Sequence, residues 1–301
     1  MATVLSHAWP HLFTFGATEN ADTNLHNPHA ITHARGSYFV SDYKNHRVQQ
    51  YSTSSGAYEA TIGSEAILQG ALGIAVYNDQ LFVSAYDLGL VQVFSLHATS
   101  PARHLRSLPT RVLQGPCHLH VDAELDELYV TEWSSHSVAV IDVANSGCGE
   151  VVRRWGRPGS GFGEFQHAYS VVVVGADAYV VDRGNSRVQV FDKRSMEFKF
   201  AFGRAGCACG EFSDPRVIAS GPAIGSTSPH ADVALYISDD HRIQVFSLAG
   251  VFISVVAGSS MEGAGARELN APVGFVVGEG RLVVADDFNN RIQVFGSDHS
   301  P

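Results

Sequence analysis

Basic residues, cysteines and long apolar runs are all scarce in this 301-residue chain. Lys and Arg total 20 against 30 Asp and Glu, and the resulting net charge of −10 disfavours long-range attraction to nucleic acid or anionic membranes. The four cysteines are too few and too irregularly spaced for a disulfide scaffold, so we expect reduced thiols. No apolar window approaches the roughly 18 residues of a membrane-spanning helix, so no membrane role is expected.

Signals for secretion and for disorder are also missing. The N-terminal stretch MATVLSHAWPHLFTFG lacks the basic start and continuous apolar core of a signal peptide, so we expect a cytoplasmic or nuclear protein. Hydrophobic residues make up 45% and charged residues only 17%, which is enough to form a large core. The composition therefore predicts an ordinary folded protein, which we expect to be a monomer.

What the chain does contain is an internal repeat. The pattern is clearest in DRGNSRVQVFD at 182–192, DDFNNRIQVF at 286–295 and DYKNHRVQQY at 42–51. Diverged copies are AYDLGLVQVF at 85–94, EWSSHSVAVI at 132–141 and DDHRIQVF at 239–246. A second motif, of the type FQHAYSV at 165–171, precedes every copy in register. The repeat takes precedence over other signals because a period of this length determines the fold.

Each unit contains short alternating runs of Val, Ile, Phe and Tyr separated by turn residues, which indicates four strands. In the fourth unit we place them near 170–174, 177–181, 187–192 and 197–202. Six such units predict an all-β, six-bladed β-propeller of four-stranded antiparallel blades, forming one domain over residues 1–301. The expected blade cores are 25–62, 68–107, 113–156, 165–203, 212–258 and 269–296, the last completed by the N-terminal strand at 11–16. The fifth unit carries an insertion at 220–232.

The repeated polar residues are interpreted as structural. Asp and Arg lie five positions apart across the hairpin between the second and third strands, where a carboxylate and a guanidinium can meet, and Asn or Gly in this hairpin tolerates positive φ. The expected pairs are Asp42 with Arg47, Asp182 with Arg187, and Asp286 with Arg291. No catalytic role is assigned to them, because they recur where no single active site could use them all.

These units resemble NHL repeats, whose pattern runs from a Gly-rich turn and Phe-x-x-Pro to Asp-x-x-Asn-x-Arg-Val-Gln-Val-Phe. The resemblance covers residues 11–296 and is best in the first, fourth and sixth copies. The second copy has Ala85 in place of the Asp, the third lacks both Asn and Arg, and the fifth is shorter. The resemblance implies a propeller but not one function, because some NHL propellers bind proteins, some bind RNA, and the peptide-amidating lyase is a metal-dependent enzyme.

The residues expected to bind a partner lie on the face that carries the inter-blade loops and the hairpins. Tyr169 and Arg216 are neighbours there and belong to residue types enriched at binding hot spots. They are part of a ring formed by the position that opens each first strand: His29, Leu72, Cys117, Tyr169, Arg216 and Val273. The predicted partner-binding set is Tyr169, Arg216, His29, the hairpin residues Trp133 and Phe288, and the loop residues Arg157 and Arg204.

Motifs for catalysis or metal binding are weak. His29, His118, His120 and His167 lie near first strands, but zinc catalysis needs three ligands that converge on one point. The Cys207-Ala-Cys209 pair and the Gly-rich loops are interpreted as loop structure, since no Gly-x-Ser-x-Gly or phosphate-binding motif is present. We therefore predict no cofactor and no catalysis, with a metal-dependent lyase as the less favoured alternative.

The sequence thus favours a rigid propeller that binds a protein or peptide through its loop face. The alternative is single-stranded RNA binding on the same face. Bases would then stack on Tyr169, Trp133 or Phe288, and phosphates would contact Arg157, Arg204 and Arg216.

Overall fold

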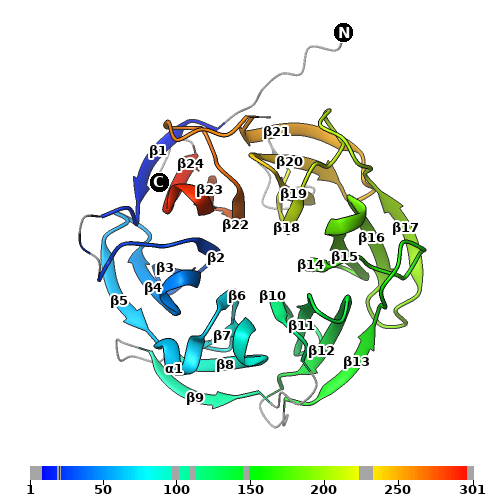
Figure 1. The fold of residues 1–301 in the computed structure, drawn as a ribbon, viewed down its shortest axis with the longest axis horizontal. Coiled ribbons are helices and arrows are strands. Elements are labelled where there is room, and N and C mark those ends of the chain that lie inside the picture. The colour runs from blue at the N-terminus through cyan, green and yellow to red at the C-terminus, as the bar shows by residue number, and fades with distance from the viewer. Residues whose placement is uncertain are drawn as a thin grey trace.

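The six-bladed propeller predicted from the repeat is confirmed. A computed structural model describes residues 9–18, 20, 22–96, 102–108, 113–144, 149–223, 233–259 and 261–296. In these residues the strands form six four-stranded antiparallel sheets, arranged as blades around a central axis (Figure 1). None of the helices in the described part is long and apolar enough to cross a membrane.

Blades one to three follow one another along the chain. Their strands are β2 (Pro28–Ala34), β3 (Ser37–Asp42), β4 (Arg47–Ser52) and β5 (Tyr58–Ile62); β6 (Ala71–Tyr77), β7 (Gln80–Ala85), β8 (Leu90–Ser95) and β9 (Arg103–Ser107); and β10 (Pro116–Asp122), β11 (Glu127–Glu132), β12 (Ser137–Asp142) and β13 (Val151–Trp155). A short helix, α1 (Glu65–Leu68), lies in the loop before blade two.

Blades four to six complete the ring. Their strands are β14 (Ala168–Val174), β15 (Asp177–Asp182), β16 (Arg187–Asp192) and β17 (Phe198–Phe202); β18 (Pro215–Pro222), β19 (Val233–Asp239), β20 (Arg242–Ser247) and β21 (Phe252–Gly258); and β22 (Pro272–Gly278), β23 (Arg281–Asp286), β24 (Arg291–Gly296) and β1 (His11–Phe15). Most of the predicted insertion in blade five, residues 224–232, lies outside the described residues, as does Cys148.

The N-terminal strand closes the ring, as the sequence predicts. β1 pairs antiparallel with β24, with Phe15 opposite Ile292, so the first strand of the chain is the outer strand of the last blade. Phe15 also packs against blade one, with ring centroids 5.9 Å from Tyr38 and 4.9 Å from Tyr51. The ring is therefore joined by both backbone pairing and aromatic packing, which protects an edge that would otherwise be open.

Large aromatic side chains at equivalent positions fill the space between blades. Tyr129, Tyr179 and Tyr236 each lie three residues before the acidic residue that ends the second strand, and each is at most 1% exposed. Burial of such a side chain contributes on the order of 2–3 kcal/mol to folding. The second strands of blades three, four and five thus each contribute a buried tyrosine at the same position, whereas blade six has Val283 there.

The repeated Asp joins three segments on the loop face. The fully buried Asp182 accepts from the backbone N–H of Gln166 in the preceding inter-blade loop (2.8 Å), from Asn185 (2.9 Å) and from Arg187 Nε (2.7 Å). Asp42 and Asp286 form the corresponding ion pairs with Arg47 (2.8 Å) and Arg291 (2.7 Å). All three Asp–Arg pairs expected from the repeat are thus present.

The hairpins of four blades share one backbone conformation. In the first, fourth and sixth blades each hairpin is a 3₁₀ turn, η1 (Tyr43–Asn45), η3 (Arg183–Asn185) or η4 (Asp287–Asn289), and blade two has η2 (Tyr86–Leu88). Positive φ falls on the residue after the turn, which is Gly89 (65°) and Asn290 (52°) in blades two and six but His46 (53°) and Ser186 (51°) in blades one and four. The repeated Asn, which is Asn45, Asn185 or Asn289, donates through its side chain to the Asp at 2.9 Å.

Diverged blades reach a similar arrangement with other residues. In blade three, Glu132 accepts from the Gln114 backbone N–H (2.8 Å) and pairs with Arg154 (2.7 Å), which comes from the fourth strand rather than the hairpin. In blade five, the shorter hairpin still brings Arg242 to Asp239 at 2.9 Å. A buried carboxylate with a guanidinium partner therefore holds five of the six blades in the described structure.

Substitution of Asp182 by Ala should lower the free energy of unfolding by about 3–5 kcal/mol, because it leaves the partly buried Arg187 and the loop N–H groups without an acceptor. Urea denaturation of the full chain measures this change. The matched control is Arg35→Gln at the exposed Arg35–Asp79 pair (2.6 Å), where a loss of about 1 kcal/mol or less is expected. Equal losses in the two variants would contradict the structural role of Asp182.

Candidate binding site at the channel mouth

The six blades surround a central channel. The residues that open the first strands, His29, Leu72, Cys117, Tyr169, Arg216 and Val273, form an inner ring at its mouth, and each lies at a β-bulge. In the first strand of blade one the register shifts between Pro28 and Ile31, and His29 lies in this bulge. Corresponding shifts occur at the start of the other five first strands. Because a bulge turns a side chain away from the regular pleat, this feature directs the ring residues toward the channel.

Hydroxyl groups from neighbouring blades hold this ring in place. A Ser or Thr on the second strand of one blade donates to the backbone carbonyl of the ring residue in the next. The four pairs are Ser41 to Leu72 (2.6 Å), Ser84 to Cys117 (2.7 Å), Thr131 to Tyr169 (2.8 Å) and Ser238 to Val273 (3.1 Å). The backbone of the ring is therefore fixed by contacts between blades.

A second, outer ring comes from the first residue of each hairpin. This position directly follows the end of the second strand and carries Tyr43, Tyr86, Trp133, Arg183 and Asp287 in blades one, two, three, four and six. In blade five it is Asp240, whose hairpin is two residues shorter and which does not line the pocket. The pocket thus has aromatic side chains from blades one, two and three and charged side chains from blades four and six at this position.

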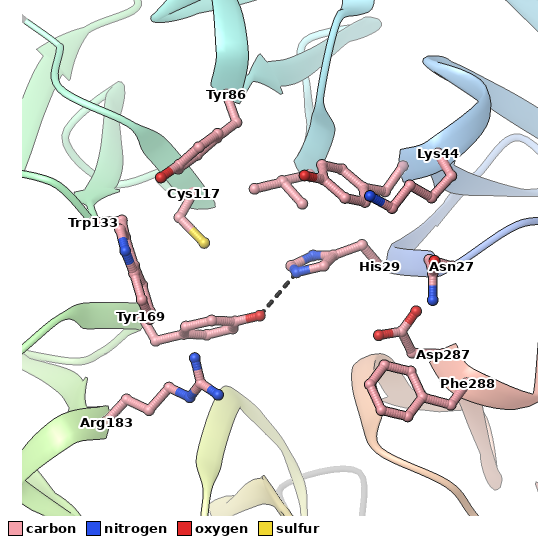
Figure 2. A pocket seen from close by; sticks show the side chains of 12 residues that line it. Asn27, His29, Lys44, Tyr86, Cys117, Trp133, Tyr169, Arg183, Asp287 and Phe288 are labelled. Atoms are coloured by element: carbon pink, nitrogen blue, oxygen red, sulfur yellow. Dashed lines mark hydrogen bonds between the residues drawn. The ribbon is translucent and has the colours of Figure 1, made fainter.

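The two rings enclose a cavity of about 370 Å³ at the mouth of the channel. Figure 2 shows Trp133, Tyr169 and Arg183 on one side of this space and Lys44, Asn27 and Asp287 on the other. Phe288, which is 58% exposed, stands at the rim beside Asp287. The size is at the lower end of ligand pockets, and the lining combines apolar rings with a few polar groups, as in many binding sites.

A hydrogen bond between opposite blades forms the floor of the pocket. His29 Nε2 of blade one lies 2.8 Å from the Tyr169 hydroxyl of blade four. Burial, assisted by the charge of Arg216, lowers the pKa of His29 to about 3, so this imidazole is neutral at physiological pH. Burial likewise raises the pKa of the Cys117 thiol to about 12. Neither group has the pKa of an efficient acid–base catalyst or nucleophile near neutral pH.

Arg183 is the central cation of this site. Its guanidinium lies 5.3 Å from the ring centroids of both Trp133 and Tyr169, and it donates to Asp214 through Nε (2.5 Å) and Nη2 (3.0 Å). Asp214 also pairs with Arg216 at 2.9 Å. Asp214 therefore pairs with both Arg183 and Arg216. The cation–π contact of Arg183 with Trp133 orients the indole ring at the pocket wall.

Asp287 is the carboxylate of the pocket, and it is only 6% exposed. Its Oδ1 atom has no hydrogen-bond partner among the described residues. Burial raises the pKa of Asp287 to about 6, although Asn27 and Arg216 act in the opposite direction. A buried polar atom without a partner is costly, and the pocket lining holds two such atoms, Oδ1 of Asp287 and Nδ1 of His29.

The predicted partner-binding residues fall into two groups. His29, Tyr169, Trp133 and Phe288 all line the pocket. Arg216 lies behind it, paired with Asp214, and Arg183 takes the position at the pocket that the sequence suggested for Arg216. Arg157 and Arg204 are exposed, but they pair with Glu164 and Glu211 at 2.8 Å each, so the expected local excess of positive charge is offset.

The candidate metal ligands do not come together. Among the described residues, no group of three or more His, Cys, Asp or Glu side chains is placed to hold a metal ion. His118 and His120 are on β10, and burial lowers their pKa values to about 3 and about 4. His167 stacks on Trp133 with centroids 4.0 Å apart, away from His29 on the opposite side of the channel.

Sequence reasoning missed Tyr43, Lys44, Tyr86, Arg183 and Asp287 as pocket residues. A usable signal was present, since all except Lys44 directly follow the repeat position that ends the second strand. Tracing that position through all six copies identifies the outer ring in the same way that the first-strand position identified the inner one.

The raised pKa of Asp287 has a consequence for stability. A carboxyl group whose pKa is higher in the folded state favours folding below its ordinary pKa, and this contribution is lost as the pH rises through about 6. Relative to wild type, Asp287→Asn should therefore gain on the order of 3 kcal/mol in unfolding free energy between about pH 4 and pH 7. Denaturation at both pH values measures the difference, with Asp240→Asn as control. A difference independent of pH would contradict the environment assigned to Asp287.

Comparisons with known proteins support the fold. Neither a protein-family model nor a curated protein matches the chain. An auxiliary nutrient binding protein from Bacteroides ovatus is similar in structure, with a TM-score of 0.71 and 13% identity over 96% of this chain and 77% of that chain. A counterpart from Bacteroides thetaiotaomicron gives 0.68 and 14% over 90% and 69%.

An enzyme is also among the similar structures. A catalytically inactive variant of virginiamycin B lyase from Staphylococcus aureus, solved with quinupristin, has a TM-score of 0.61 and 10% identity, covering 93% of this chain and 82% of that chain. At such low identities these likenesses show the shared fold alone. The chain is a six-bladed β-propeller with a pocket at the mouth of its central channel.

Proposed function

We propose that this chain is an NHL-type propeller that acts as a non-enzymatic binding module, holding a protein or peptide segment on its loop face. The observation that carries the proposal is the half-ring of Tyr43, Tyr86 and Trp133 around the channel-mouth pocket, with Phe288 at the rim. Aromatic side chains of this kind supply large contact areas at little cost in conformational entropy and are enriched at binding hot spots.

The state of the titratable groups supports binding rather than catalysis. His29 is neutral over the physiological range, the Cys117 thiol has a raised pKa, and the two are held by a rigid ring of bulged strands. A preorganised site of this kind loses little freedom on binding a ligand, which is the property that a recognition module requires.

Charge favours a peptide over RNA. The chain has a net charge of −10, and Arg157 and Arg204 are each paired with a glutamate. Phosphates would have to compete with these carboxylates for the guanidinium groups. A peptide that fills the pocket needs no such exchange, because the aromatic rings and Arg183 are already placed at the pocket wall.

Selection of peptides from a random display library on the immobilised full chain tests the proposal. Selected peptides should lose at least tenfold in affinity, or about 1.4 kcal/mol, on Phe288→Ala and Tyr86→Ala, because both side chains line the pocket. Isothermal titration calorimetry gives the affinities. The matched control is Phe162→Ala, which removes a phenylalanine that is 71% exposed but outside the pocket.

Two results would overturn the proposed function. One is a library that yields no peptide sensitive to Phe288→Ala. The other is tighter binding of a single-stranded oligoribonucleotide than of any selected peptide, lost in the same variants and steeply weakened by salt, which would establish the RNA alternative.

A further inference from the structure

Three features of the channel-mouth pocket restrict the chemistry of the group that it can hold. The first is an acceptor without a donor: Asp287 is only 6% exposed, and its Oδ1 has no hydrogen-bond partner among the described residues. The side chain of Asn27 hydrogen-bonds the Asp287 carboxyl group and Arg216 is committed to Asp214, but neither supplies a donor to Oδ1. A ligand that enters the pocket must therefore bring an N–H or O–H group to Asp287, or the acceptor stays unsatisfied.

The second feature is a pair of cations that flank the same space. Lys44 is exposed at the rim, with Nζ 4.9 Å from the ring centroid of Tyr43, and it forms no ion pair within the described residues. Arg183 stands across the pocket from it (Figure 2). With two cations and one carboxylate in the lining, a Lys or Arg anchor would add a third positive charge. An acidic anchor would leave Asp287 without a donor and set a second carboxylate beside it.

The third feature is the aromatic half-ring itself. Tyr43, Tyr86 and Trp133 come from three consecutive blades and line the same pocket as Phe288, so a flat ring in this pocket meets other rings at their faces or edges. Such arrangements favour an aromatic guest beyond the effect of buried area alone. The cavity of about 370 Å³ fits one large side chain rather than a folded loop.

We propose that the pocket holds an aromatic side chain that carries a polar hydrogen, tryptophan or tyrosine, from the bound segment. The indole N–H or phenol O–H donates to Asp287 Oδ1, and the two faces of the ring are directed toward Lys44 and Arg183 on opposite sides of the pocket. The guest is neutral, so it adds no charge to the lining, and each of its two negative faces attracts one cation. This inference rests on the proposed function and names the anchor at the same site.

The test uses small probes with the full chain and ligand-observed NMR titration. N-acetyltryptophanamide should bind at least fivefold more tightly than its indole N1-methyl derivative, which has the same ring but no N–H donor. N-acetylleucinamide and N-acetyllysinamide should bind more weakly than N-acetyltryptophanamide. Equal binding of the tryptophan probe and its methylated form, or tighter binding of the lysine probe, would overturn the proposal.

Variants of the protein assign the donor contact. Asp287→Ala should abolish the preference for the unmethylated indole, whereas Asp240→Ala, at the equivalent hairpin position of blade five, should retain it. Lys44→Met provides a second variant at an exposed side chain and should weaken the tryptophan probe about threefold without changing the effect of methylation. A preference that survives Asp287→Ala refutes the assignment of the acceptor.

The outcomes for the anchor and for the binding module are distinguishable. Selected peptides that require Phe288 but lack Trp and Tyr would leave the peptide-binding function standing and overturn the anchor. Probe binding with the expected dependence on the N–H group and on Asp287, in a chain that selects no peptide, would support the anchor chemistry and overturn the peptide-binding function.

Discussion

The buried carboxylate at the end of the second strand is the contact on which the loop face depends. In the best repeats it receives hydrogen bonds from the preceding inter-blade loop, from the hairpin Asn and from the Arg that opens the third strand. A charge in this position is tolerated because several donors surround it. The same contact joins elements that would otherwise be independent loops, so the hairpin is held in a defined position relative to its blade in every blade except blade two, which has Ala85 at this position.

The positions of the pocket residues depend on these contacts within and between blades. Bulges at the start of the first strands direct the inner ring toward the channel, and hydroxyl groups such as Ser84 and Thr131 fix that ring to the neighbouring blade. The hairpins place the outer ring above it. Because each ring uses one sequence position per blade, the chemistry of the pocket can vary blade by blade without disturbing the fold. In this chain the outer-ring residues that line the pocket are aromatic in blades one to three and charged in blades four and six.

Polar groups at the mouth of the channel differ in whether they have a hydrogen-bond or ion-pair partner. Arg157, Arg204 and Arg216 are each paired with a carboxylate, so they contribute to loop structure more than to a basic surface. Asp287 differs from them as a buried carboxyl group with one oxygen unpartnered, and the neighbouring His29 likewise has a buried Nδ1 atom without a partner. Functional sites commonly retain such groups at a cost in stability, because the group is satisfied when ligand binds. This contrast distinguishes the pocket from the rest of the loop face.

The amino-acid sequence by itself determined the six blades, the closing role of the N-terminal strand, the Asp–Arg pairs and the composition of the inner ring, because all of these repeat at a local spacing that can be traced along the chain. Only the tertiary structure decided which blades face each other. The contact of His29 with Tyr169 joins residues 140 positions apart, and the pairing of Glu132 with Arg154 replaces a hairpin partner with one from another strand. The unpartnered Oδ1 of Asp287 is likewise a property of the assembled ring, since satisfaction of a polar atom depends on every neighbour that the fold brings to it.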